Sequence, residues 1–523
     1  MIILQKRTVI RTNAYYDSVT LMRISSQAEK LEGVTQVMVG MGTQLNKEAL
    51  DKVGLLSSEA EKAEPNDLML GVEAEDRVSL DDVFEAIDKL ISSRSRSEIK
   101  VKEKSYGTIE EAVLKEGGFN LAVISIPGAY AAREAKHALN NGIHVFLFSD
   151  NVSIEQEREL KSIAQDKGLL MMGADCGTAI INGIPLGFAN RVRRGNVGII
   201  GASGTGTQQV TTLLHELGAG VSQVIGTGGR DMSSYIGGKM TLAALDALQK
   251  DEATEVIVII SKPPSPEVAE SLLRKAGEID KVIILCLMGA KPYTMLKENT
   301  VQCFNLEETA LKAAEASLGR KVYLEEEQYN HIPVESFKSI RSVKQKYIRA
   351  LYGGGTLCDE AMMLFRKGNI PMYSNIPLNE NEALKDINKS IGNTFLDMGE
   401  DYFTRGKPHP MIEPSLRNKR LMEEAMDEET AVILVDVELG HGCHRNPAGV
   451  VADCADEINK RLYKTGRSIL WIAAVVGTDM DPQNMEEQLD RLKKSGFVVF
   501  KSNIRAASLA AEFVQEGGES IGY

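Results

Sequence analysis

Two glycine-rich segments each stand between an apolar run and an amphipathic stretch: Gly201-Ala-Ser-Gly-Thr-Gly206 and Gly353-Gly-Gly-Thr356. The first backbone N–H groups of a helix lack partners inside it, and the helix dipole adds partial positive charge there. Glycine lets an anion approach closely, and nearby hydroxyls can bind it. Plain tight turns share this pattern. We favour a phosphate or carboxylate cradle, formed by Ser203, Gly204, Thr205, Gly206, Gly354, Gly355 and Thr356.

Three of the seven histidines are candidates for acid–base chemistry. His409 lies between two prolines, and His441 and His444 follow the apolar run Ala431–Val437. Open α/β sheets bind ligands where strands end. A histidine there can act as general acid or base, or hydrogen-bond an anion, although a surface or capping role is the alternative for each. The pattern His441-x-Cys443-His444 lacks a fourth ligand, so we predict no metal site.

Short apolar runs bounded by glycine alternate with amphipathic stretches along most of the chain. Strands apolar on both faces, alternating with helices, indicate parallel sheets covered by helices, and the predicted fold class is α/β. The clearest strand candidates are Gln36–Val39, Leu68–Gly71, Leu121–Ile126, Val145–Phe148, Val197–Ile200, Val256–Ile260, Val282–Leu287, Ala431–Val437 and Ile469–Val476.

An internal repeat relates residues 196–318 to residues 347–515. Each segment begins with a glycine-rich turn and closes with a strand, an asparagine (Asn305 or Asn503) and a helix. Matched elements in one order indicate two similar domains in tandem. Packed about a pseudo-twofold axis, these domains could point both helix starts at one anion.

The charge-rich segment 321–346 is predicted to be a linker. It separates a domain at 195–320 from one at 347–523, and residues 1–194 form a further α/β domain. A length of 523 residues fits about three domains.

Composition excludes several classes of function. A formal net charge of -13 and 5% aromatic residues argue against nucleic-acid binding. Six scattered cysteines without a CxxC pair indicate reduced thiols. No signal peptide is evident, and no apolar stretch approaches the about 18 residues that span a membrane. We therefore expect a soluble, cytoplasmic, oligomeric protein whose partners are small anionic molecules and other protein subunits.

Several motifs carry a family resemblance. Met172-Gly-Ala-Asp-Cys-Gly-Thr178 and the first glycine-rich segment resemble the α subunit of succinyl-CoA synthetases. Thr394–Gly399 and Ala431–Gly440 resemble the CoA-ligase domain of the β subunit. The fused arrangement, together with Tyr352–Glu360, is most similar to FdrA proteins. This resemblance covers essentially the whole chain. It implies a Rossmann-like CoA-binding-type domain followed by two flavodoxin-like parallel-sheet domains.

The resemblance also implies binding residues and exposes departures from the family. Pro127 resembles a CoA-contacting turn, whereas the family's first glycine turn is absent, and Asn13, Asp17 and Ser18 stand there either as CoA contacts or as helix caps. Arg230 could clamp a substrate carboxylate, and Asn305 is a secondary candidate. The region that carries the family's phosphohistidine, residues 287–306, contains no histidine, and the chain has no ATP-grasp domain.

The FdrA resemblance implies a subunit that handles an acyl-phosphate or carbamoyl-phosphate group beside partner subunits. In purine-nitrogen breakdown, such proteins pass a carbamoyl group between oxamate and phosphate. The ligands expected are therefore phosphate or an acyl phosphate, with CoA as a further candidate. Two alternatives remain: an ADP-forming acyl-CoA ligase that works with a separate ATP-grasp subunit, and a non-catalytic subunit that senses an anion or CoA. Redox work with NAD(P) ranks last, because the N-terminal region lacks the G-x-G-x-x-G pattern.

Overall fold

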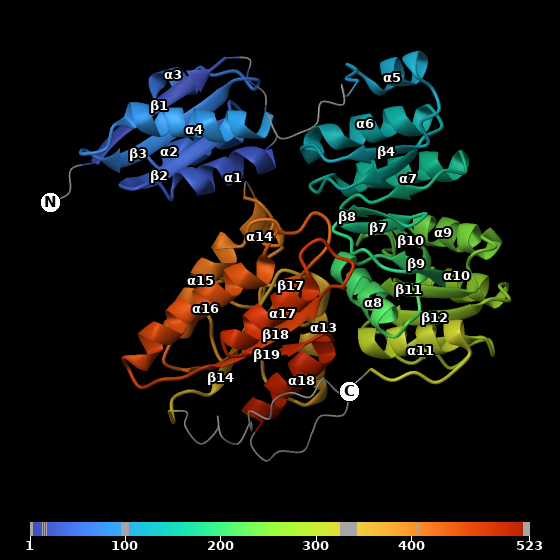
Figure 1. The fold of residues 1–523 in the computed structure, drawn as a ribbon. Coiled ribbons are helices and arrows are strands. Elements are labelled where there is room, and N and C mark those ends of the chain that lie inside the picture. The colour runs from blue at the N-terminus through green and yellow to red at the C-terminus, as the bar shows by residue number, and fades with distance from the viewer. Residues whose placement is uncertain are drawn as a thin grey trace. The chain divides into compact units, whose positions relative to one another are not determined.

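The computed structural model describes residues 4–12, 14, 16, 18–95, 104–324, 342–405 and 407–515. The chain divides into two compact units: residues 1–105 with 404–408, and the remainder (Figure 1). The predicted linker falls mostly on residues 325–341, which lie outside the described residues. No helix in the described part of the chain has the length and hydropathy that a membrane span requires.

The N-terminal unit is built on an antiparallel sheet with strand order β1-β3-β2. Helices α1 and α4 contribute Leu21, Ile24 and Ile87 to the core on this sheet. The elements are β1 (Leu4–Arg11), α1 (Ser18–Ala28), β2 (Val34–Met41), α2 (Gln44–Lys52), α3 (Ser58–Glu61), β3 (Leu68–Glu75) and α4 (Leu80–Ser95).

This antiparallel sheet corrects the prediction of one Rossmann-like domain over residues 1–194. Strand β1 is an edge strand without a fully buried residue, and only the central strand β3 is buried along most of its length. Antiparallel sheets tolerate such partly exposed strands, whereas parallel sheets are normally covered on both faces. The parallel part of this region begins only at Leu121.

A small parallel sheet, β4-β5-β6, opens the larger unit. Its strands are β4 (Leu121–Ile124), β5 (His144–Leu147) and β6 (Met171–Met172), and its helices are α5 (Ile109–Lys115), α6 (Gly128–Asn140) and α7 (Ile154–Asp166). Alanines of α6, among them Ala131 and Ala135, pack with Leu160 of α7 in one core.

The next domain has a seven-stranded sheet, ordered β13-β12-β11-β9-β10-β7-β8, in which β9 to β13 run parallel and β7 and β8 are antiparallel. Val258 of β11 packs in the core that contains α8 and α11, whereas Ile257 and Ile259 pack in the core that contains α9 and α10. The elements are β7 (Thr178–Ile181), β8 (Ile184–Gly187), β9 (Arg194–Gly201), α8 (Gly204–Glu216), β10 (Val221–Gly226), α9 (Lys239–Lys250), β11 (Val256–Ser261), α10 (Pro266–Gly277), β12 (Val282–Leu287), β13 (Thr300–Cys303) and α11 (Leu306–Leu318).

The last domain is a six-stranded parallel sheet, ordered β15-β16-β14-β17-β18-β19. Its elements are β14 (Tyr347–Tyr352), α13 (Gly355–Lys367), β15 (Tyr373–Ser374), η1 (Glu380–Glu382), β16 (Thr394–Asp397), α14 (Asp401–Thr404), α15 (Ser415–Met426), β17 (Thr430–Glu438), α16 (Pro447–Tyr463), β18 (Leu470–Val476), α17 (Met485–Lys494), β19 (Phe497–Phe500) and α18 (Asn503–Val514).

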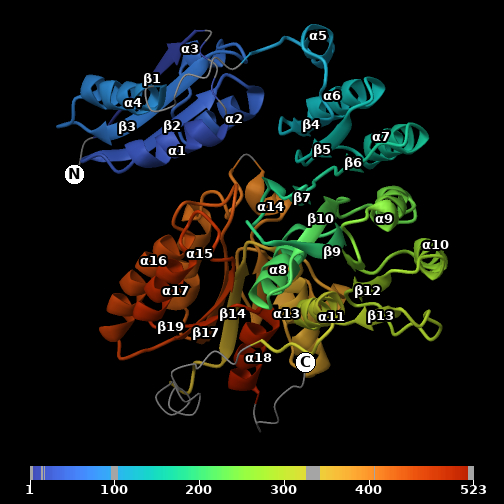
Figure 2. The same ribbon diagram turned by 45° about the vertical axis from the view of Figure 1, so that its right-hand side comes forward.

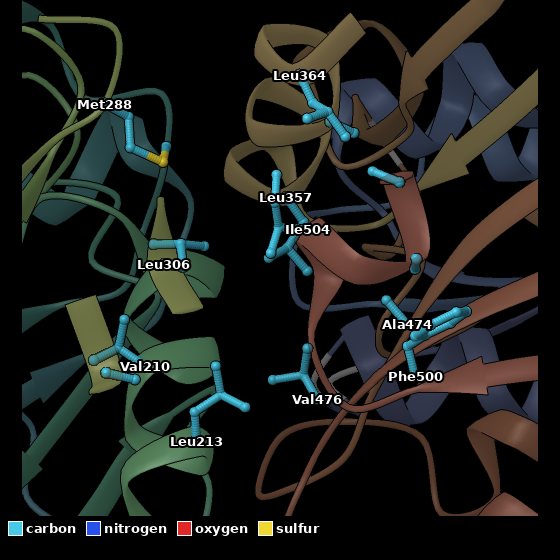
Figure 3. Close-up of a cluster of buried hydrophobic side chains, with 14 of the residues drawn as sticks. Val210, Leu213, Met288, Leu306, Leu357, Leu364, Ala474, Val476, Phe500 and Ile504 are labelled. Atoms are coloured by element: carbon cyan, nitrogen blue, oxygen red, sulfur yellow. The ribbon is translucent and has the colours of Figure 1, made fainter. Parts of the chain in front are cut away.

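The two parallel-sheet domains repeat one topology, and the predicted α/β class with tandem parallel sheets is confirmed. The order β13-β12-β11-β9-β10 corresponds strand by strand to β19-β18-β17-β14-β16. Helices α8 and α11 of the first domain pack against α13 and α18 of the second (Figure 2). Their side chains, including Leu213, Leu306, Leu357 and Ile504, form one shared core (Figure 3). This shared core brings the starts of α8 and α13 together.

Replacing Phe365 by alanine tests this core. Phe365 is fully buried, and its ring contacts Phe395 edge-on at 4.8 Å between centroids. A buried Phe→Ala change removes packing and leaves a cavity, so we expect the free energy of unfolding to fall by about 3–5 kcal/mol. Guanidinium unfolding followed by fluorescence of Trp471, the single tryptophan, measures the change in the same domain. Tyr463→Ala, at a side chain 86% exposed, is the control, and an equal effect of both changes contradicts the prediction.

Candidate functional site

The starts of α8 and α13 meet through their side chains. Ser203 Oγ lies 2.5 Å from Thr356 Oγ1. A Cβ added at Gly206 would lie 2.8 Å from Thr356 Cγ2, and one added at Gly354 would lie 2.7 Å from Thr205 Cγ2. Both glycines are therefore required by the close approach of the two loops. The structure brings all seven predicted cradle residues into one junction.

The start of α13 already holds an anion that belongs to the chain. The Asp436 carboxylate, from β17, accepts hydrogen bonds from the N–H groups of Gly353 and Gly354, each at 2.7 Å. Arg417 Nη1 donates to Asp436 Oδ1 at 3.1 Å and to the Asp436 carbonyl at 2.9 Å, and both side chains are buried. The two-helix cradle predicted from the sequence thus has its α13 half filled by Asp436.

The start of α8 is the more open half of the junction. Ser203 caps this helix by accepting the N–H of Gly206 at 3.1 Å. Gly204 and Thr205 are only half-buried. A Cβ at Gly204 would meet no atom nearer than Thr178 Oγ1, at 3.5 Å, and the Cα of Gly177, at 3.7 Å. Gly204 at the start of α8 is therefore less crowded than Gly355 at the start of α13, where an added Cβ would overlap the Asp397 carboxylate.

Further acids surround the start of α13. Asp397 ends β16 beneath Gly355 and accepts the N–H of Gly399 at 2.9 Å. Burial raises the pKa of Asp397 to about 7. Asp359 is ion-paired with Lys262, with 2.7 Å between Nζ and Oδ2. Two acids and one cation, Asp397, Asp359 and Lys262, therefore lie at the start of α13.

Glu438, the last residue of β17, lies beside Asp436. Burial, followed by the Asp436 carboxylate, raises the pKa of Glu438 well above its ordinary value. Asp436 has two amides and a guanidinium to hold its negative charge.

The three predicted histidines gather on loops that share contacts. His409 Nδ1 accepts the N–H of Met411 at 3.2 Å, and the His444 N–H donates to the carbonyl of Met411 at 2.7 Å. The His441 N–H donates to the carbonyl of Ala189 at 2.9 Å, and His441 Nε2 is buried without a hydrogen-bond partner among the described residues. The ring of His409 lies 5.3 Å from that of Phe188.

Buried hydrogen bonds of Asn190 join the two repeated domains beside these histidine loops, and the sequence did not predict them. Asn190 donates to Asp481 Oδ2 at 2.7 Å and to the carbonyl of Leu439 at 3.0 Å, and accepts from Gln208 of α8 at 3.1 Å. Asp436 and Arg417 were also missed. The signal available was the pair of acids, Asp436 and Glu438, inside an otherwise apolar strand.

The other predicted site residues have structural partners or lie elsewhere. Arg230 pairs with Glu157 at 2.7 Å and donates to the carbonyl of Val152 at 2.9 Å. Asn305 caps α11 by accepting the N–H of Glu308 at 2.7 Å. Pro127 is exposed at the start of α6. Asn13 and Asp17 lie outside the described residues, and Ser18 is the first residue of α1.

The ends of β4 and β5 are where an open sheet would bind the nucleotide of CoA. Here the described ionisable groups are mainly acidic. Asp150 follows β5, and the carboxyl of Asp175, an exposed residue, lies close enough to Asp150 to be affected by its charge. The nearby cations with described contacts, Arg230 and Lys161, are both engaged by Glu157. We therefore assign no CoA contact to this edge of the sheet.

Comparisons with known proteins decide the family. Residues 192–286 match the family described as CoA binding domain, and residues 351–513 match that described as CoA-ligase. The chain is 44% identical over 514 residues to the uncharacterized protein YahF of Escherichia coli K12, which covers 98% of this chain and 99% of YahF. The chain belongs to the YahF family. It therefore carries CoA-binding-type and ligase domains of the acyl-CoA synthetase kind.

Two more distant similarities of this YahF-family chain cover only part of it or have a low score. The chain is 30% identical over 179 residues to subunit alpha 2 of the ADP-forming succinate–CoA ligase of Archaeoglobus fulgidus. This match covers 33% of the chain and 61% of that subunit. An acetyl-coenzyme A synthetase structure from Ca. Korarchaeum cryptofilum is 15% identical, with a TM-score of 0.31, and covers 80% of this chain and 86% of that one.

Residues 4–106 match a family described as AllF, heavy metal-associated domain. The donor set does not fit a soft metal, because residues 1–105 contain neither cysteine nor histidine. The methionines Met41 and Met69 lie in the hydrophobic core. Across the described residues, no group of three or more His, Cys, Asp or Glu side chains could hold a metal ion. We derive no metal chemistry from this match.

The raised pKa of Asp397 predicts a pH dependence of stability. Asp397 binds its proton more tightly in the folded chain, where its pKa is about 7, than at the ordinary value of 3.8. The contribution of Asp397 to the free energy of unfolding is complete at pH values below its ordinary pKa of 3.8. This contribution is lost as the pH rises through the pKa of the folded chain, about 7. We expect Asp397→Asn to reduce the loss of stability between about pH 4 and about pH 7, while Glu360, whose pKa is also raised, still causes part of that loss. Urea unfolding at each pH measures this, and an unchanged pH slope contradicts it.

Proposed function

We propose that this chain is a group-transfer subunit that moves an acyl or carbamoyl group to or from inorganic phosphate. The phosphoryl group would lie at the first turn of α8, beside Ser203 and Thr205. One observation carries the proposal: the 2.5 Å contact between Ser203 and Thr356, which joins the helix starts of two repeated domains. Asp436 already accepts the N–H groups of Gly353 and Gly354 before α13, which supports placing the ligand at α8.

Such a junction suits a reaction that depends on position and fixed dipoles. The amides at the start of α8 bring partial positive charge to a phosphoryl oxygen without a mobile cation. The hydroxyls of Ser203, Thr205 and Thr356 are held by packing, so they need little reorganisation as charge develops. Alignment of the two reactants supplies much of the remaining rate enhancement.

The FdrA resemblance favours carbamoyl-oxamate and phosphate as the substrate pair. A phosphate oxygen attacks the carbamoyl carbon, and the bond from that carbon to the oxamate nitrogen breaks. The proton lost by phosphate goes to the departing nitrogen. The products are carbamoyl phosphate and oxamate, so atoms and charge balance without an oxidant, a reductant or ATP.

The second candidate is an ADP-forming acyl-CoA ligase that works with a separate ATP-grasp subunit. The matches to CoA-binding and CoA-ligase families favour it. At the ends of β4 and β5 the described cations Arg230 and Lys161 are engaged by Glu157, so these residues add no support for a CoA site there. A subunit that only senses an anion is the third alternative.

One pair of assays separates these candidates. The purified chain, alone and with candidate partner subunits, is tested for phosphate-dependent loss of carbamoyl-oxamate and, in parallel, for CoA-thioester formation. Phosphorolysis supports the first proposal, and thioester formation supports the ligase. Two negative results with every partner supplied leave the sensing role.

Gly206→Ala tests the junction directly. The added methyl group would lie 2.6 Å from Ser203 Oγ and 2.8 Å from Thr356 Cγ2, and so would force the two helix starts apart. Because the donors then miss the developing charge, we expect kcat to fall by about 100-fold. The matched control is Gly277→Ala at the end of α10, where an added Cβ meets nothing within 4 Å. A Gly206→Ala enzyme as active as this control argues against the site.

A further inference from the structure

We propose that His409 is a neutral hydrogen-bond donor that binds an oxygen of the transferred acyl or carbamoyl group through Nε2–H. This inference rests on the proposed function for the identity of that oxygen. The tautomer and the position of the His409 ring are argued from its own contacts and do not depend on the proposed function.

The tautomer of His409 follows from its hydrogen bond. Nδ1 accepts the N–H of Met411 at 3.2 Å and must therefore present a lone pair. A neutral imidazole carries one proton, so that proton is on Nε2. The backbone holds this arrangement, because the N–H groups of Ile412 and Glu413 both donate to the carbonyl of His409, at 2.8 and 3.0 Å. Prolines on both sides of His409 restrict the chain further.

The surroundings keep this ring uncharged. One face packs near Phe188, with 5.3 Å between ring centroids. The charged groups that act on it are Asp436 from β17, which favours the cation, and Arg417 from α15, which opposes it. Burial is the largest influence, and it lowers the pKa of His409 to about 4. Near neutral pH the side chain is a donor at Nε2 and has no free nitrogen to act as a base.

The His409 ring lies close to the loop that precedes α13. Nε2 lies near Gly399, where an added Cβ would be 2.5 Å from Nε2 and 2.6 Å from the carbonyl of Gly353. The ring is joined to the α8 loop only indirectly: it packs near Phe188, whose carbonyl accepts Thr178 Oγ1 at 2.6 Å, and the same hydroxyl reaches the carbonyl of Gly204 at 3.4 Å. The His409 side chain is partly accessible.

This position assigns His409 a task that the α8 start cannot perform. The helix amides would hold the phosphoryl oxygens, whereas a separate neutral donor polarises the carbonyl of the group being transferred. A neutral donor also avoids adding a positive charge beside Arg417. The ligand class expected at Nε2 is therefore a carbonyl oxygen of an acyl or carbamoyl phosphate.

Nitrogen NMR of the chain labelled with ¹⁵N-histidine tests the tautomer. The His409 signals are those missing from His409→Asn. We expect an Nε2–H pattern that stays unchanged between about pH 6 and about pH 8. An Nδ1–H pattern, or a titration within that range, overturns the proposal. Adding carbamoyl phosphate should shift the Nε2 signal, and no shift at saturating probe also overturns it.

The second part of the test measures kcat in variants of His409. His409→Ala should lower kcat for phosphorolysis by about 100-fold, and His409→Gln, whose amide can donate from a similar position, should restore part of it. Equal loss in both variants assigns His409 to packing alone. If the wild-type chain turns over no substrate, the proposed function fails, whereas the response of Nε2 to carbamoyl phosphate still decides the donor role.

Discussion

The site depends on one interaction, the Asp436 carboxylate held by two amides at the start of α13 and by the buried Arg417. A buried carboxylate is costly unless its charge is fully compensated. Here the helix start and the guanidinium compensate it, and in return Asp436 fixes the loop that presents Thr356. Burial and the nearby Asp436 carboxylate raise the pKa of the neighbouring acid Glu438. The presence of Asp436 at the start of α13 is the reason that we place the proposed ligand at the start of α8.

Duplication explains how the partners of this interaction meet. Each domain alone would expose the apolar face of two helices, α8 with α11 or α13 with α18, and packing these faces together buries both. In each domain the helix begins where its central strand ends, at β9 or β14. Hydrophobic burial far from the chemistry therefore aligns the two polar loops. The hydrogen bonds of Asn190 then connect the first domain to the end of β17.

Sequence patterns predicted the elements with strong local signals and missed those that depend on tertiary partners. The repeat, the parallel sheets and the meeting of Ser203 with Thr356 follow from apolar runs and glycine spacing. The antiparallel N-terminal sheet did not, because the local sequence of a strand such as β1 does not reveal whether its partner runs parallel or antiparallel. Arg230 looked like a substrate clamp because nothing local reveals Glu157, which is 73 residues away. The role of Asp436 likewise depends on Arg417 and on amides more than 80 residues away.

The ion-pair network behind Arg230 has a mechanical consequence. Lys161 of α7 is wholly buried and contacts Glu157 at 2.8 Å, Asp231 at 2.9 Å and the carbonyl of Thr227 at 2.8 Å. If α7 moved away from the loop after β10, these ion pairs would separate while their charges were still shielded from water. Separating buried charges in this way has a high free-energy cost. These buried ion pairs therefore hold the β4-β5-β6 lobe rigidly against the first repeated domain. We do not expect a hinge motion between these two lobes to open a path for a ligand.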